Sequence, residues 1–174
     1  MCFLPLSLVL LFMKLLGGLM PKKINSKKLK EYLLVYVDES EEFLEAMKYA
    51  CELAKTESLG IILLYIIQDE SFRHWKGVEN IMREEQKNEA KEVLEKYITF
   101  IEDNYKLNVK SYIKTGEKLE ILIKTLNGKR PKVKNLVLGL AMDKIENNKI
   151  ISSLTGILRK KLTLPIIIVP GKIK

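Results

Sequence analysis

A stretch near the C-terminus carries the residues best suited to bind an anion. The segment LVLGLAMDKIENNKIISSLTG, residues 136–156, runs from an apolar run that ends at Gly139 to the hydroxyl pair Ser152 and Ser153, with Thr155 close behind. Free N–H groups and the dipole at a helix N-terminus favour negative charge, and hydroxyls can add hydrogen bonds. The order strand, loop, helix therefore predicts an anion site, although serine is also a common N-cap residue without any ligand.

A second candidate is Asp38, which directly follows the apolar run Tyr32–Val37. A carboxylate at the end of a parallel strand could accept a hydrogen bond from a ligand hydroxyl or amine. It could equally bond the backbone amides of its own turn. The pair Asp38-Glu39 also resembles the acidic pair of a phosphoacceptor receiver domain. That chemistry needs an aspartate after the third strand, where this chain has Lys114-Thr115-Gly116, so we reject it.

Catalytic and metal-binding constellations are not evident in the sequence. His74 is the only histidine, and no cysteine or second histidine accompanies it in the segment Phe72–Gly77, so we expect no metal site there. We interpret this segment as a loop pinned by Phe72 and Trp75, with a lid over a ligand as the alternative. Neither G-x-x-x-x-G-K-[ST] nor G-x-G-x-x-G occurs. We therefore expect no catalytic residues and no turnover enzyme.

Strands and helices must alternate to position these candidates. Apolar or alternating runs predict five strands: Tyr32–Val37, Ile61–Ile67, Leu107–Lys114, Val133–Leu138 and Pro165–Pro170. Helical spacing fills the intervals, with Ser40 as the expected N-cap of the first helix and a last helix lined by Ile151, Leu154, Leu158 and Leu162. The pattern predicts a single-domain, Rossmann-like α/β fold, in which a five-stranded parallel sheet is flanked by helices on both faces. Leu107–Lys114 alternates and is expected at a sheet edge.

Composition and charge indicate a globular domain with a basic surface. The chain has 174 residues, 47% hydrophobic and 30% charged, and a net charge of +8. Lysine clusters in such a chain can attract nucleic acid or anionic lipid. Because no aromatic residues interleave with the lysines, we favour a solvated surface and expect no nucleic-acid partner. Cys2 and Cys51 form neither a disulfide framework nor a metal cluster, which favours a reducing, cytoplasmic setting.

The N-terminal residues differ from the rest. We divide the chain into a hydrophobic leader at residues 1–20, a basic linker at residues 21–30 and a domain at residues 31–171. The leader lacks the basic start and cleavage site of a signal peptide. It is long enough for a membrane anchor, and only then would we expect a membrane partner. We favour a start of translation at Met13 or Met20 instead.

The chain resembles the universal stress protein family between Tyr32 and Pro170. The resemblance rests on a strand that ends V-D-x-S at Asp38, an amphipathic helix (EEFLEAMKYACELA), a strand that ends in Gly139, the closing S-x-T helix and the segment LPIIIVP. It implies the five-stranded parallel fold and a homodimer formed through the last strand, Ile166–Val169.

The family's ATP-binding motif, G-x2-G-x9-G-[ST], is only partly present. The resemblance places its three glycines at Gly139, Met142 and Ser152, and its hydroxyl residue at Ser153. It also implies an adenosine contact at Asp38 and a phosphate contact at Thr155. A thioether at Met142 would occupy space that a triphosphate needs, so we expect weak or no ATP binding in a homodimeric regulatory or binding module. An ATP-binding protein or slow ATPase is the alternative, and a nucleic-acid or membrane-surface protein is the third.

Overall fold

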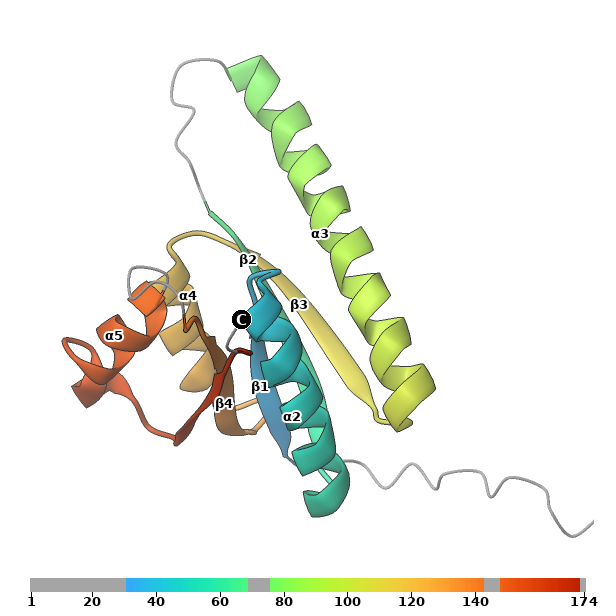
Figure 1. Ribbon diagram of the computed structural model, residues 1–174. Helices are drawn as coiled ribbons and strands as arrows, with labels where there is room; N and C mark the ends of the chain where they lie inside the picture. The colour runs from blue at the N-terminus through green and yellow to red at the C-terminus, as the bar shows by residue number, and fades with distance from the viewer. Residues whose placement is uncertain (1–30, 69–75, 143–147, 173–174) are drawn as a thin grey trace, which may run out of the picture.

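Strands and helices alternate along the chain, and the strands form one sheet (Figure 1). The computed structural model describes residues 31–68, 76–142 and 148–172, with side chains from residue 82 onward in the second range. The strands are β1 (Tyr32–Val37), β2 (Gly60–Ile67), β3 (Val109–Thr115), β4 (Val133–Leu140) and β5 (Ile166–Pro170). The helices are α2 (Glu41–Glu57), α3 (Lys76–Tyr105), α4 (Lys118–Leu126), α5 (Lys149–Thr155) and the 3-10 helix η2 (Arg159–Lys161).

All strand pairs in the sheet are parallel, in the order β3-β2-β1-β4-β5. The predicted fold class is confirmed, and β3 lies at an edge as its alternating pattern predicted. Every residue of β1 is buried because the strand is central and is covered on both faces. The winding of the chain reverses between β1 and β4, and ligands in open parallel sheets bind beside the carboxyl ends of strands at such a point.

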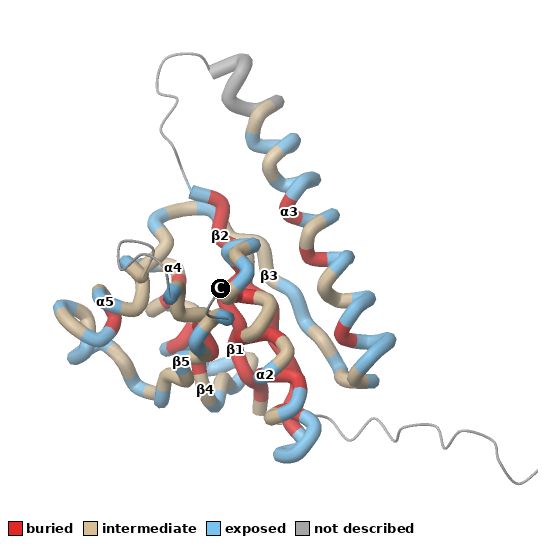
Figure 2. Tube along the Cα trace, in the orientation of Figure 1, coloured by how far each residue is buried: buried red, intermediate tan, exposed pale blue. Residues whose placement is uncertain are grey.

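Two apolar layers fill the space between the sheet and its helices (Figure 2). On one face, α2 and α3 cover alternate strand residues such as Leu33 and Val35 around Phe43. On the other face, α4 and α5 cover the intervening residues, such as Leu34 and Tyr36, through Leu122 and Leu154. Successive side chains along a strand point to opposite faces of the sheet, so each apolar strand contributes residues to both cores.

Two helix boundaries differ from the sequence prediction. The last helix does not run through Leu162: α5 ends at Thr155, Gly156 follows as its C-cap, and η2 is a separate turn. Helix α3 begins at Lys76, so the end of the predicted Phe72–Gly77 loop is helical, while residues 72–75 lie outside the described part of the chain. By contrast, Ser40 caps α2 as predicted.

The predicted leader and basic linker, residues 1–30, also lie outside the described ranges. Within those ranges, no helix is both long enough and apolar enough to cross a bilayer.

Candidate functional site

The topology brings three of the six sequence-predicted site residues to one edge of the sheet. Strands β1 and β4 are parallel neighbours, with Val35 opposite Val137. Asp38 directly follows β1, and Gly139 lies near the end of β4. Because the carboxyl ends of parallel strands meet at the same edge, these two positions and Met142 beyond β4 share the point where the winding reverses. Their role in ligand binding stays a prediction.

The carboxylate of Asp38 forms hydrogen bonds within its own turn. Its Oδ1 atom accepts from the Ser40 backbone N–H at 3.1 Å and from the Ser40 hydroxyl at 2.7 Å. The Ser40 Oγ atom in turn accepts from the Phe43 backbone N–H at 3.0 Å. This arrangement closes the turn and caps α2, as expected of aspartate and serine before a helix. The structure therefore contains the turn geometry that was the alternative to a ligand contact at Asp38.

Glu39 and Tyr65 form a contact that the sequence pattern did not indicate. Glu39 has a positive φ of 61°, a region in which most non-glycine residues are uncommon. The Tyr65 hydroxyl on β2 donates to Glu39 Oε1 at 2.9 Å. Burial, and then this hydrogen bond and the charge of Glu39, raise the pKa of Tyr65 to about 12. The contact holds the β1–α2 turn against the end of β2.

Gly139 provides room for α2 to pack on β4. A Cβ atom at this position would lie 2.6 Å from the backbone C and O atoms of Glu42 and 2.9 Å from its Cβ. Gly139 does not adopt a positive φ; among the described glycines, that conformation belongs to Gly116. Glycine is therefore needed at 139 for close approach between two backbones, whether or not a ligand binds.

Met142 lies on the surface just beyond β4, with 47% of the residue exposed. Its backbone φ is not positive, so the position does not require glycine for conformational reasons. Residues 143–147, which follow it in the predicted phosphate loop, lie outside the described ranges. Any obstruction of a triphosphate by Met142 would therefore come from a surface side chain, and it stays a prediction.

The serine pair lies inside α5 and not at its head, which corrects the sequence prediction. The helix begins at Lys149, three residues before Ser152. The Ser152 hydroxyl donates to the backbone carbonyls of Asn148 and Lys149, each at 3.1 Å. The Thr155 hydroxyl, at the end of the helix, donates to the Ile151 carbonyl at 2.8 Å. These bonds, common for serine and threonine in helices, direct both hydroxyls to their own backbone.

Ser153 differs from its two hydroxyl neighbours. It is half-buried, and its side chain forms no hydrogen bond with another described residue. Among the hydroxyls of Ser152, Ser153 and Thr155, that of Ser153 is therefore the one that is not bonded to its own helix. Its role in phosphate binding stays a prediction.

Asn148 joins the two ends of the predicted phosphate loop, a role that the sequence analysis missed. Its side chain accepts from the Ala141 backbone N–H and donates to the Ala141 carbonyl, both at 2.9 Å. The amide thus pairs with the backbone just after β4 in the way a neighbouring strand would. Its position directly before the helix indicates an N-cap, but its side chain makes no capping hydrogen bond, so no local pattern in the sequence indicated the bonds to Ala141.

Solved structures of the universal stress protein fold match this chain over almost their full length. The hypothetical protein MJ0577 superposes with a TM-score of 0.66 at 24% identity, covering 84% of this chain and 99% of that one. UspA from Lactobacillus plantarum gives 0.63 at 18% identity, covering 81% and 98%. A family protein from Arabidopsis thaliana with AMP bound gives 0.56 at 16% identity, covering 82% and 92%.

Further matching structures are complexes of universal stress proteins with cAMP and, from Archaeoglobus fulgidus, with dAMP. No protein-family model matches the sequence, and no curated protein matches it. At these identities the likeness establishes the fold: the chain has the five-stranded fold of the universal stress proteins.

Proposed function

We propose that this chain is a divergent universal stress protein, a homodimeric regulatory or binding module of the cytoplasm that binds ATP weakly or not at all. The proposal rests on the observation that most polar side chains at the motif positions already form hydrogen bonds within the protein. Asp38 bonds Ser40, and the hydroxyls of Ser152 and Thr155 bond their own helix. A phosphate would have to compete for the hydroxyl protons of Ser152 and Thr155, so each of these contacts would contribute less net free energy than an open donor would.

Charge at the same edge also disfavours a triphosphate. Four carboxylates stand within five positions after β1, at Asp38, Glu39, Glu41 and Glu42. The backbone of Glu42 lies against Gly139 at the end of β4, so this acidic segment adjoins the strand end from which the phosphate loop begins. Like charges at close range repel more strongly next to a protein surface than in bulk water.

An adenine-nucleotide-binding protein or slow ATPase is the second candidate. Three matching structures hold cAMP, AMP or dAMP. A monophosphate needs fewer phosphate contacts than ATP, and Ser153 offers a hydroxyl free of partners among the described residues. This candidate would use Asp38, Gly139, Ser153 and Thr155.

The nucleotide content of the purified protein separates these two candidates. The full-length chain would be denatured in acid, and the released nucleotides would be quantified by ion-pair chromatography. The proposal predicts far less than one nucleotide per chain. An occupancy near one adenine nucleotide per chain, lost in Ser153→Ala and kept in Lys55→Ala, an exposed control in the last turn of α2, would instead establish the second candidate.

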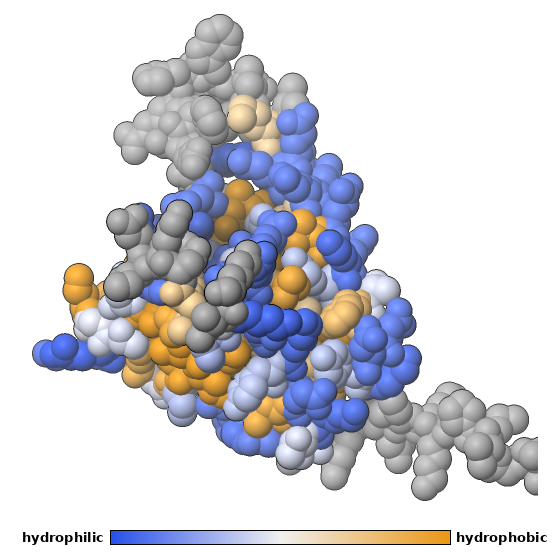
Figure 3. All heavy atoms as spheres, in the orientation of Figure 1, coloured by the Kyte–Doolittle hydropathy of each residue, from blue (hydrophilic) through white to orange (hydrophobic). Residues whose placement is uncertain are grey.

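The proposed dimer forms through β5, which lies at the edge of the sheet opposite β3. This strand is Ile-Ile-Ile-Val-Pro, with 39% of Ile168 exposed, and Ile157 in the preceding segment is 91% exposed. Figure 3 shows hydrophobic side chains gathered at the surface near β4 and β5. An uncharged aliphatic edge is a natural template for strand pairing or for a partner's apolar surface.

Light scattering tests the dimer directly. The wild-type chain should have twice the mass of the monomer, and Ile168→Lys should shift it to monomer by placing a charge at the proposed contact. The matched control is Ser111→Lys, which introduces the same charge at an exposed position of the other edge strand, β3, and should leave the dimer intact. A wild-type chain that stays monomeric at high concentration would rule out this part of the proposal.

Nucleic-acid or membrane-surface binding is the third candidate and has less support. Two described lysines of the basic regions are neutralised locally, since Lys132 pairs with Glu31 and Lys134 pairs with Glu57 at 2.6 Å. A steep fall of DNA or vesicle binding with rising salt would favour this candidate.

A further inference from the structure

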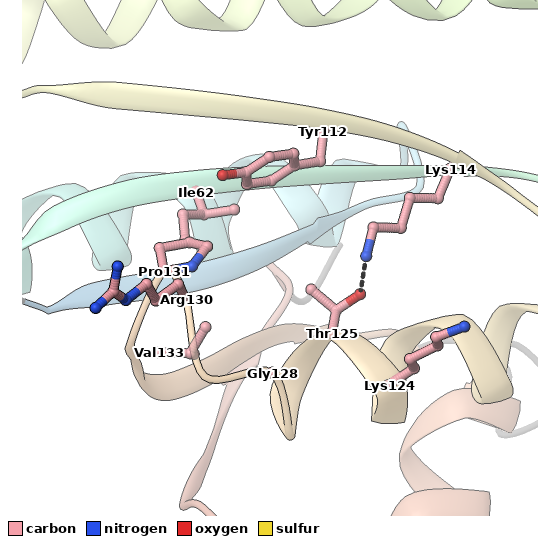
Figure 4. A pocket seen from close by; sticks show the side chains of 9 residues that line it. All are labelled: Ile62, Tyr112, Lys114, Lys124, Thr125, Gly128, Arg130, Pro131 and Val133. Atoms are coloured by element: carbon pink, nitrogen blue, oxygen red, sulfur yellow. Dashed lines mark hydrogen bonds between the residues drawn. The ribbon is translucent and has the colours of Figure 1, made fainter.

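A small groove lies between α4 and the sheet, formed by residues that the proposed nucleotide site does not use. Its volume is about 130 Å³. Ile62 on β2, Pro131 in the α4–β4 loop and Val133 at the start of β4 supply apolar surface. Tyr112 on β3 and Gly128 after α4 complete much of the wall (Figure 4). The groove therefore opens on the α4 face of β2 and β3, with a lining that combines apolar and cationic side chains.

Lys114 brings a half-buried cation to this groove. Its ammonium group reaches from β3 to the Thr125 hydroxyl of α4 at 2.9 Å (Figure 4). That hydroxyl already donates to the Ile121 carbonyl at 2.7 Å, so it offers Lys114 an acceptor and no charge. An ammonium group has three donors, and a cation withdrawn from water without a counter-charge is costly.

Two further cations lie at the groove, and none of its lining residues carries a carboxylate. Arg130 extends from the loop at the end opposite Lys114, and Lys124 lies on α4 beside Thr125 (Figure 4). Within the described ranges neither forms an ion pair, whereas the nearby Lys132 and Lys134 both do. The last turn of α4 attracts cations through its dipole, which accounts for Lys124. Figure 4 shows the Lys124 ammonium and the Arg130 guanidinium extending outward, whereas Lys114 points to Thr125 across the groove.

We propose that this groove binds a small organic anion, with its apolar body on Pro131 and Val133 and its carboxylate or phosphate at Lys114. The volume of about 130 Å³ is slightly smaller than the roughly 150 Å³ of an apolar cavity that holds a benzene molecule. The groove therefore takes a short aliphatic chain, or one ring that lies partly in solvent, and the acid group of the ligand lies at Lys114. The anion would satisfy the two free donors of Lys114, and Arg130 would attract it to the groove.

Titration with model acids, followed by amide chemical shifts of the full-length chain, tests the proposal. The probes are benzoate and phenyl phosphate, and benzyl alcohol is the neutral control of similar size. We expect saturable shifts at the amides of Ile62, Tyr112 and Val133 for at least one of the two anions. Benzyl alcohol should produce weaker, unsaturated shifts. The preferred anion then distinguishes a carboxylate ligand from a phosphate ligand.

Variants assign the binding to the groove. Lys114→Gln should weaken the preferred anion at least tenfold, and Lys96→Gln, which removes an exposed charge on α3, should leave it unchanged. Arg130→Gln alters only a loop side chain and should weaken binding severalfold even if Lys114→Gln reduces stability. The proposal would be overturned if the shifts failed to saturate with both anions. It would also be overturned if wild type and Arg130→Gln bound the anion equally well and wild type bound benzyl alcohol as tightly as the anion.

Discussion

Replacement of Gly139 by alanine should destabilise the fold in the absence of any ligand. The added Cβ atom would lie 2.6 Å from two backbone atoms of Glu42. Non-bonded carbon atoms normally approach to about 3.5 Å, so α2 would have to move by roughly 1 Å. Overpacking costs about 1–3 kcal/mol, and we expect the upper part of that range because a helix backbone cannot rotate away as a side chain can.

The assay is thermal and urea unfolding of the full-length chain. For a domain of this size each kcal/mol shifts Tm by about 2–4 °C, so Gly139→Ala should lower Tm by roughly 4–12 °C. Gly171→Ala is the matched control, because its Cβ would meet the flexible Cγ of the same residue, Glu42, at 2.6 Å. Glu42 can rotate there, so this variant should lose much less stability.

A double-variant comparison separates backbone from side-chain contact. Glu42→Ala removes the Cγ atom and should relieve Gly171→Ala, but it leaves the backbone and Cβ that obstruct Gly139→Ala. A Gly139→Ala protein as stable as wild type would refute the packing role assigned to this glycine. Full rescue of that variant by Glu42→Ala would refute it as well.

Two further predictions concern the turns around the site. Asn148→Ala removes both bonds to Ala141, so it should lower the free energy of unfolding in urea by about 1–3 kcal/mol and speed hydrogen exchange at the Ala141 amide. In Asn148→Asp, which keeps an acceptor for that amide, the Ala141 amide should exchange more slowly than in Asn148→Ala. Equal exchange of this amide in wild type and both variants would contradict the pairing. The pKa of Tyr65 is raised to about 12 in the folded state. The stabilisation of the fold by the neutral Tyr65 hydroxyl is therefore complete below the unfolded pKa of about 10 and is lost as the pH rises through about 12. The free energy of unfolding should therefore decline less steeply above about pH 10 in Tyr65→Phe than in wild type. If the urea midpoints of the two proteins fell in parallel with rising pH, Tyr65 would not make this contribution to stability.

The fold could be predicted because its signals are local and repeated. Uninterrupted apolar runs such as Tyr32–Val37 indicate strands buried on both faces, and the helical spacing between them requires parallel crossovers. The same pattern places Asp38 and Gly139 at the carboxyl edge of the sheet, because each follows or ends a predicted strand. That much of the site follows from element order alone.

The local contacts of the site depend on side chains distant in sequence or on a helix boundary. The need for glycine at 139 arises from Glu42, 97 positions earlier in the chain, and no local pattern reports such an approach. The start of α5 at Lys149 turned the serine pair into interior helix residues, although serine before an apolar run usually indicates a cap. Helix boundaries are the least certain part of such a prediction, since several capping arrangements have similar free energies.

Calorimetric titration of the full-length chain with ATP and Mg²⁺ tests the central claim most directly. The account predicts no saturable heat at nucleotide concentrations up to about 1 mM, which corresponds to less than about 4 kcal/mol of binding free energy. A micromolar Kd that is lost in Ser153→Ala would contradict it, because the motif would then bind ATP despite Met142 and the internal bonds of Asp38, Ser152 and Thr155.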